Sequence, residues 1–343
     1  MKSSKSTRQT IKFPFPIFFA VLIVGFIGGW VIKGILLDDT NSSNLKALRL
    51  NGYKFISPLL FCDAGNSEES TDQKLENKIK QLVDKEVESG NVNTASVFFR
   101  DIKSGNQVNI NPEEKFFPAS LHKIPIMIGY LNAARSDPGI LSKKITITEP
   151  DTNGELEIKP KDFAKSGNTY TVEELIEKMI KYSDNISTNT LMHNIDRQVL
   201  DTAFKDLQLS PPTDRSTQDY MTAGDFSYFF RVLYNATYLR RELSEKALNL
   251  LSQVDFKEGL VAGVPQGVDV AHKFGLFTEV QPVGGDMAIL SKRELHDCGI
   301  VYHPDNPYLL CVMTKSNNPN LANVEGTIKN ISSLVYGEVD RNY

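Results

Sequence analysis

Apolar residues recur along the chain with the periods of helices and strands. In residues 75–87 they return every three or four positions, which predicts a helix. Residues 95–102 and 107–110 are strand-like runs on either side of a Ser-Gly turn, so they predict a hairpin. Residues 120–134 are apolar at most positions, which is typical of a buried helix.

The rest of the chain predicts a helical middle followed by more strands. A helix is expected over residues 171–181, where Thr171 and Glu174 have the spacing of a capping box, and further helices should continue to about Leu251. The remaining strands are predicted over residues 268–277, 287–290, 298–302 and 308–313, with a closing helix over 328–335. This order favours one antiparallel sheet flanked by helices, in the α/β (α+β) class.

The start of the chain has the pattern of a membrane anchor. Residues 13–32 carry no charge, and about 20 apolar residues are enough to cross the hydrocarbon core. Four basic residues precede them, and such a leader stays in the cytoplasm. A cleaved signal peptide is the alternative, but the apolar run is long and no Ala-x-Ala site follows it. We predict a leader over 1–12, a single-pass plasma-membrane anchor over 13–37, and everything later outside the cytoplasm.

The segment after the anchor is polar and differs from the globular body. Residues 38–75 predict an extracytoplasmic tether, in which an apolar patch at 55–62 should pack on the body or on the membrane surface. Residues 76–336 predict a single domain, and 337–343 a tail. After residue 37 the chain has 33 basic against 42 acidic residues, which argues against nucleic acid as a partner.

The first candidate motif is Ser120-Leu-His-Lys123. On a helix, a serine and a lysine three positions apart share one face. A serine hydroxyl is a poor nucleophile until a base takes its proton, and a lysine in a low-dielectric pocket can lose its own proton and serve as that base. The pattern is weak by itself, because it also occurs at Ser43 and Lys46 in the tether.

The second motif is Ser183-Asp184-Asn185, at the end of the capped helix. A second serine can pass a proton to a leaving group, and an asparagine amide can hydrogen-bond a substrate carbonyl. An ordinary polar junction between two helices is the alternative, since these residue types are also good turn formers.

The third motif is Lys273-Phe274-Gly275, on a predicted strand. Its lysine could bind a substrate carboxylate and keep the site electropositive. Its glycine would let a substrate lie along the strand edge without an intervening side chain. The alternative is an exposed lysine on a strand, with no role in chemistry.

In this order the three motifs resemble those of the class A β-lactamases and penicillin-binding proteins, which are Ser-x-x-Lys, Ser-Asp-Asn and Lys-Thr/Ser-Gly. The flanking segments at 97–105, 117–120, 259–273 and 296–313 also resemble that family. The resemblance implies a β-lactamase-like fold. Such a fold has a five-stranded antiparallel sheet between helices and an all-helical lobe, with the active site between them.

The resemblance also implies roles for four catalytic residues. Ser120 would be the acylated nucleophile and Lys123 would activate it. Ser183 would relay the proton, while Lys273 would tune Ser183 and receive the substrate carboxylate.

Three further residues would bind the substrate. Asn185 would hold the acyl side chain, and Gly275 would leave room along the strand. The N–H groups of Ser120 and Leu276 would form an oxyanion hole. The family needs no cofactor or metal, and its substrates are β-lactams or peptidoglycan peptides. We expect a monomeric catalytic domain.

Two departures from the family pattern affect substrate and turnover. Phe274 stands where the family has a hydroxyl that helps to grip the carboxylate. Residues 207–222 contain no Glu, whereas class A enzymes carry a Glu-x-x-x-Asn loop that activates the deacylating water. Asp214 or Asp219 could substitute. A later Glu-x-x-x-Asn at 245–249 falls in a predicted helix and is attributed to coincidence.

These observations predict a membrane-anchored serine acyl-hydrolase that opens β-lactams through an acyl-enzyme on Ser120. One alternative is a D,D-peptidase-like penicillin-binding enzyme with slow deacylation. The other is a non-catalytic module that binds cell-wall peptide or a partner.

The cysteines and histidines predict no metal site. No cysteine pair has zinc-finger spacing, and no two histidines are four apart. Cys298 and Cys311 would face one another if the hairpin turn centres between Pro304 and Asp305. A cross-strand disulfide is then possible, but two buried free thiols are the favoured interpretation.

Overall fold

The computed structural model describes residues 47–62, 71–151, 156–207, 209, 219–284 and 287–342. The predicted leader at 1–12 and anchor at 13–37 lie outside these residues. None of the helices in the described part of the chain is long and apolar enough to span a membrane.

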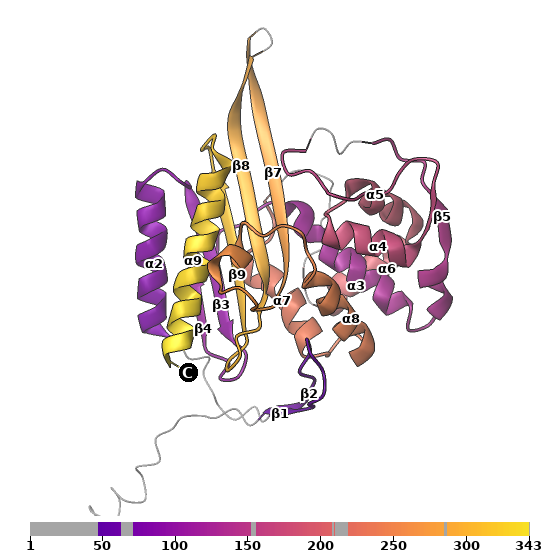
Figure 1. Ribbon diagram of the computed structural model, residues 1–343, viewed down its shortest axis with the longest axis horizontal. Helices are drawn as coiled ribbons and strands as arrows, with labels where there is room; N and C mark the ends of the chain where they lie inside the picture. The colour runs from indigo at the N-terminus through magenta and orange to yellow at the C-terminus, as the bar shows by residue number, and fades with distance from the viewer. Residues whose placement is uncertain are drawn as a thin grey trace, which may run out of the picture. The chain divides into compact units, whose positions relative to one another are not determined.

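A five-stranded antiparallel sheet in the order β4-β3-β9-β8-β7 forms the centre of the domain (Figure 1). Its strands are β3 (Thr94–Asp101), β4 (Gln107–Ile110), β7 (Val270–Gly284), β8 (Met287–Val301) and β9 (Tyr308–Ser316). The first hairpin pairs through β3 with the last strand, so the sheet joins both ends of the domain. The predicted antiparallel sheet is confirmed, and β7, which carries the third motif, is an edge strand.

The strands predicted separately at 287–290 and 298–302 are one strand, β8, so this division was wrong. The charged residues between the two apolar runs resembled a loop between two strands. In the fold they lie on the paired strand, where Lys292 forms an ion pair with Asp219 and Arg293 forms one with Glu157. The hairpin of β7 and β8 therefore extends beyond β9, whose pairing with β8 ends at Arg293 (Figure 1).

Helices cover the sheet on both faces. Helices α2 (Gln73–Glu88) and α9 (Leu321–Asn342) lie on one face, and α7 (Ala223–Tyr234) lies on the other (Figure 1). The helical lobe beyond α7 contains α3 (Lys123–Ala133), α4 (Val172–Lys181), α5 (Asn185–Asn194), α6 (Arg197–Asp206) and α8 (Arg241–Leu251). It also carries a small sheet of β5 (Lys144–Thr146) and β6 (Thr169–Thr171). Short 3-10 turns complete the fold: η1 (Ala119–His122), η2 (Pro138–Ser142) and η4 (Leu260–Gly263).

The segment before α2 is partly built into the domain. Its strands β1 (Ala47–Arg49) and β2 (Leu59–Cys62) pair with each other. Between them Phe55 and Ile56 are buried, so this part of the predicted apolar patch packs on the body, whereas Leu60 is 47% exposed. The backbone N–H groups of Phe55 and Ile56 donate to the carboxylate of Glu245 at 2.9–3.1 Å. Glu245 thus anchors this segment from within α8, in agreement with its expected helical position.

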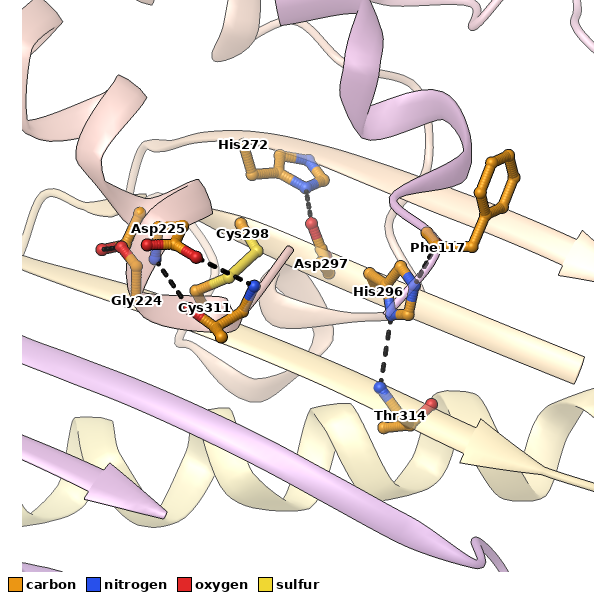
Figure 2. The surroundings of a disulfide bond; sticks show 11 residues. Phe117, Gly224, Asp225, His272, His296, Asp297, Cys298, Cys311 and Thr314 are labelled. Atoms are coloured by element: carbon orange, nitrogen blue, oxygen red, sulfur yellow. Dashed lines mark hydrogen bonds and ion pairs between the residues drawn. A yellow bond between two sulfur atoms is a disulfide. The ribbon is translucent and has the colours of Figure 1, made fainter. Parts of the chain in front are cut away.

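Cys298 on β8 and Cys311 on β9 form a disulfide (Figure 2). The two residues are directly paired in the strand register, as their sequence positions predicted. Their Cα atoms are 3.9 Å apart and both side chains are buried. The favoured interpretation of two free thiols was therefore wrong, because the register brings the two side chains together on one face of the sheet.

Candidate active site

Ser120 lies in a 3-10 turn, η1, that leads into α3, rather than in the first turn of the helix. Ala119, just before it, has φ of +47°, a left-handed conformation that is uncommon outside glycine. Phe117 is held from β8, because its N–H donates to Glu294 at 2.9 Å. Its carbonyl accepts from His296 at 3.0 Å (Figure 2). Contacts from a buried strand therefore fix the backbone that presents Ser120.

The buried amino group of Lys123 is the centre of the site. Its Nζ lies 3.0 Å from Ser120 Oγ and 3.0 Å from Ser183 Oγ. It also lies 2.6 Å from the carbonyl oxygen of Ser183 and 2.8 Å from Oδ1 of Asn185. Burial lowers the pKa of Lys123 to about 7, against the opposing effect of the Asp184 carboxylate.

These contacts fit a neutral amine. Two of the four acceptors, the Ser183 carbonyl and the Asn185 amide oxygen, can only accept hydrogen bonds. They account for both protons of an uncharged lysine and leave its lone pair for a hydroxyl proton. Lys123 is thus arranged to take a proton from Ser120 at near-neutral pH.

The Ser-Asp-Asn motif forms a hydrogen-bonded junction between α4 and α5. Ser183 has φ of +58°, and Asp184 is the N-cap of α5. The buried Asp184 carboxylate accepts from the N–H groups of Ile186 and Ser187, each at 3.0 Å, and from Ala164 on a distant loop. The sequence indicated turn chemistry here, but it gave no sign that Asp184 ties the motif to that loop.

Lys273 completes a chain of hydrogen bonds between the motifs. Its Nζ donates to Ser183 Oγ at 2.9 Å and to the Phe274 carbonyl at 3.0 Å. Burial and then the charge of Lys123 hold the pKa of Lys273 well below its usual value, opposed by the Asp297 carboxylate. The structure thus links Ser120, Lys123, Ser183 and Lys273 in one continuous network.

A buried pair behind Lys273 supports the strand that carries it. His272 Nδ1 and Asp297 Oδ1 are 2.8 Å apart, and both side chains are inaccessible to solvent (Figure 2). The other Asp297 oxygen accepts from the N–H of Leu260 at 2.9 Å. Sequence reasoning missed this carboxylate, whose only local signal is a charge within an apolar strand.

Phe274 occupies the third motif as part of an aromatic pair. Its ring stacks on Phe256, with centroids 4.4 Å apart and planes 23° apart. The centroid of the same ring lies 4.1 Å from Nζ of Lys273. Two stacked aromatic rings therefore lie beside the lysine, at the position where the family pattern has a hydroxyl group. No periodic pattern marks Phe256 in the sequence, so its part in the site could not be predicted.

Gly275 lets β7 approach the turn that holds Ser120. A Cβ at this position would lie 2.7 Å from the carbonyl oxygen of Pro118 and 3.1 Å from the backbone nitrogen of Ser120. Only a residue without a side chain fits between the two segments. Leu276 is the next residue on the same strand. The two expected N–H donors of the oxyanion hole, those of Ser120 and Leu276, therefore belong to the two segments that meet at Gly275.

The structure disfavours Asp219 as a substitute general base. Burial raises the pKa of Asp219, but hydrogen bonds from Lys292 and Lys315, at 2.8 and 2.9 Å, outweigh it and lower that pKa. A carboxylate held by two ammonium groups is a weak proton acceptor. Asp214 lies outside the described residues. Within the described ranges no group of three or more His, Cys, Asp or Glu side chains could hold a metal ion.

Comparison with known proteins identifies a family for most of the chain. Residues 74–339 match the model of the "Beta-lactamase enzyme family". No curated protein matches the chain.

Solved structures share the fold at low sequence identity. A structure of PBP-A is 22% identical, with a TM-score of 0.63, and the match covers 80% of this chain and 99% of that one. A PBP-A mutant in an acyl-enzyme complex with penicillin G is 23% identical over the same shares, with a TM-score of 0.62. A class A β-lactamase from Mycobacterium abscessus is 20% identical, with a TM-score of 0.60, covering 78% of this chain and 99% of that one.

Proposed function

Because the chain belongs to the beta-lactamase enzyme family of serine hydrolases, we propose that it is a membrane-anchored acyl-hydrolase that opens β-lactams through an acyl-enzyme on Ser120. The observation that carries this proposal is the unbroken hydrogen-bonded network from Ser120 through Lys123 and Ser183 to Lys273. A network of this kind connects a nucleophile to a base and the base to a donor for the leaving group.

Acylation would begin with proton transfer from Ser120 Oγ to the neutral amine of Lys123, 3.0 Å away. The serine oxygen attacks the carbonyl carbon of the cyclic amide, and the carbonyl oxygen becomes an oxyanion. The N–H groups of Ser120 and Leu276 would stabilise this charge, and each such donor typically contributes about 3–4 kcal/mol.

The ring then opens when the C–N bond breaks and the amide nitrogen takes a proton. Ser183 would supply that proton and regain one from Lys123, since its hydroxyl lies 3.0 Å from Lys123 Nζ. Lys273 would hold the Ser183 hydroxyl in place at 2.9 Å. Water finally attacks the ester, which releases the acid product and regenerates Ser120.

Slow release of the acyl group is the second candidate behaviour, and one observation favours it. Asp219 is held in ion pairs with Lys292 and Lys315, and residues 207–222 contain no Glu. A D,D-peptidase-like penicillin-binding enzyme of peptidoglycan would acylate in this way without fast turnover. A non-catalytic module that binds cell-wall peptide would instead need no proton network.

We place the catalytic domain outside the cytoplasm, on a single-pass anchor over residues 13–37. The uncharged run at 13–32 and its basic leader support the anchor. The disulfide between Cys298 and Cys311 supports an oxidising compartment for the domain.

The test mixes the full-length chain, in a neutral detergent, with a chromogenic cephalosporin and a fluorescent penicillin. We expect covalent labelling, with the label mapped by mass spectrometry to the peptide that contains Ser120. Many turnovers per enzyme would establish a β-lactamase, whereas one stable label per enzyme would establish a penicillin-binding enzyme. A folded protein that gives neither signal would refute the β-lactam proposal.

The acylation rate should rise with pH through about 7. Below this pH Lys123 is protonated and cannot accept the Ser120 proton, because its pKa is lowered to about 7 by burial. The measurement is the initial rate of penicillin labelling between pH 5 and 9 at constant ionic strength. A rate that stays flat, or rises only near the usual lysine pKa, would show that Lys123 is not the base.

A further inference from the structure

Lys273 is completely enclosed, although it lies close to an accessible nucleophile. Its side chain has no surface accessible to solvent, whereas Ser120 is partly exposed. A ligand that approaches Ser120 from solvent therefore does not meet Nζ of Lys273. The family resemblance assigns the substrate carboxylate to this lysine, but an enclosed lysine cannot bind a carboxylate unless its surroundings move.

Three neighbours match the three N–H positions that a lysine nitrogen can offer. Nζ of Lys273 donates to Ser183 Oγ at 2.9 Å and to the Phe274 carbonyl at 3.0 Å. The centroid of the Phe274 ring lies 4.1 Å from the same nitrogen, and the face of an aromatic ring attracts an N–H group. A substrate carboxylate would have to displace one of these neighbours in order to bind Lys273.

The electrostatic environment of Lys273 also disfavours a bound carboxylate. Lys123 and Lys273 lie 3.0 and 2.9 Å from the same atom, Ser183 Oγ. Burial and then the charge of Lys123 hold the pKa of Lys273 well below its usual value, against the Asp297 carboxylate. This environment favours the neutral amine. A carboxylate beside a neutral amine loses its hydration without gaining an ion pair.

The Phe274 ring is held beside Lys273 by its own packing. It stacks on Phe256, with centroids 4.4 Å apart, and both residues are buried. Phe256 is itself closely packed, because a Cβ at Gly259 would come within 3.0 Å of its ring. Moving the Phe274 ring aside would break this stack and expose apolar surface. The ring is therefore a stable part of the site.

We propose that Phe274 closes this part of the site to carboxylates, and that the acyl donor of Ser120 carries no free carboxylate beside the bond that is cleaved. The inference rests on the proposed function, because it names the substrate class of that same acyl transfer. The transfer is unchanged: Ser120 Oγ bonds to the carbonyl carbon, and the leaving group takes its proton from Ser183.

This substrate class is defined by an uncharged leaving group. An ester, an amide or an internal peptide bond meets the requirement, whereas the carboxyl-terminal residue of a peptide does not. Lys273 then acts on Ser183 alone, through the hydrogen bond of 2.9 Å. Penicillin carries a carboxylate next to its leaving nitrogen, so it should still acylate Ser120, but more slowly than an uncharged derivative.

The test is a competition between benzylpenicillin and its methyl ester, mixed in equal amounts and in excess with the full-length chain in neutral detergent. The two acyl-enzymes, and the two products released from them, differ in mass by one CH₂ group. Mass spectrometry of one sample therefore gives the ratio of the two acylation rates. We expect the ester to react at least about fivefold faster, because a buried carboxylate without a partner is costly.

The substitution Phe274→Thr replaces the ring by the hydroxyl group of the family pattern. It should give a carboxylate access to Lys273 and shift the ratio at least about fivefold towards the acid. The matched control is Phe98→Thr, the same change on β3 and outside the three motifs, which should keep the ratio of the unchanged protein. The ratio in the unchanged protein tests the proposal even if Phe274→Thr fails to fold.

The outcomes separate this inference from the proposed function. If the acid reacts as fast as the ester in the unchanged protein, the inference is overturned and the acyl-enzyme proposal stands. A preference for the ester that persists in a folded Phe274→Thr protein would show that the ring is not its cause, and would also overturn the inference. Failure of both compounds to give an adduct or a product would refute the proposed function, and the inference would fall with it.

Discussion

Replacing Ser120 with alanine is expected to abolish covalent labelling by penicillin and to reduce β-lactam hydrolysis to the background rate. The substitution removes the oxygen that lies 3.0 Å from Lys123 Nζ, and no acyl-enzyme can then form at this position. Loss of a serine nucleophile typically costs about 10⁴-fold or more in turnover, because the remaining groups only bind and polarise the substrate. The measurements are label incorporation by gel fluorescence and the steady-state rate of cephalosporin hydrolysis.

A matched control for this variant exists elsewhere in the chain. Ser43 lies in the same Ser-x-x-Lys pattern, in the predicted tether, so Ser43→Ala makes the same chemical change outside the three motifs. We expect that variant to label and turn over like the unchanged protein. A melting temperature close to the unchanged value would show that Ser120→Ala is folded. If a folded Ser120→Ala protein still takes up the label, another residue is the nucleophile.

The sequence motifs predicted which residues meet, because each motif is local and their order follows the family pattern. Ser120 and Lys123 share one turn, and Ser183 and Asn185 flank one helix start. The meeting of the three motifs in one network depends on the fold. That fold was predicted correctly at the level of one antiparallel sheet flanked by helices.

The groups that support the site could not be predicted, since their partners are far away in the sequence. Glu294 and His296 hold Phe117 from a strand about 180 residues further along the chain. Phe256 reaches Phe274 from a loop, and Asp297 reaches the N–H of Leu260 from β8. A charge or an aromatic ring within an apolar strand does not reveal its partner. These contacts become visible only when the strand register is known.

The same limit explains the mistaken division of β8. Lys292, Arg293 and Glu294 interrupt the apolar run, and the isolated sequence does not show which distant residues contact these three successive charges. In the fold Lys292 and Glu294 form an ion pair with each other, and further partners come from other segments. Lys292 and Arg293 pair with Asp219 and Glu157, while Glu294 accepts from the N–H of Phe117. Charges inside a strand are stable there because the tertiary structure satisfies them.

Gly275→Ala is expected to give the second-largest loss of activity, although it removes no side chain of the proton network. The added Cβ would lie 2.7 Å from the Pro118 carbonyl oxygen and 3.1 Å from the Ser120 nitrogen. Both neighbours are backbone atoms, so β7 must move away from η1 to relieve the clash. The gap between Ser120 and Leu276 then widens, and the oxyanion loses a well-placed donor. Loss of one such donor costs about 10²–10³-fold in turnover.

The comparison of Gly275→Ala with Gly326→Ala isolates this effect. A Cβ at Gly326, on α9, would meet no atom within 4 Å, so the control should keep full activity. Because Ser120 and Lys123 remain in contact, Gly275→Ala should still form the acyl-enzyme on Ser120, only about 10²–10³-fold more slowly. Single-turnover labelling rates measure this directly. Labelling as fast as in the unchanged protein would show that the close approach of β7 to Ser120 does not contribute to catalysis. Slow but complete labelling would show that the variant has lost part of the oxyanion hole and has kept its nucleophile.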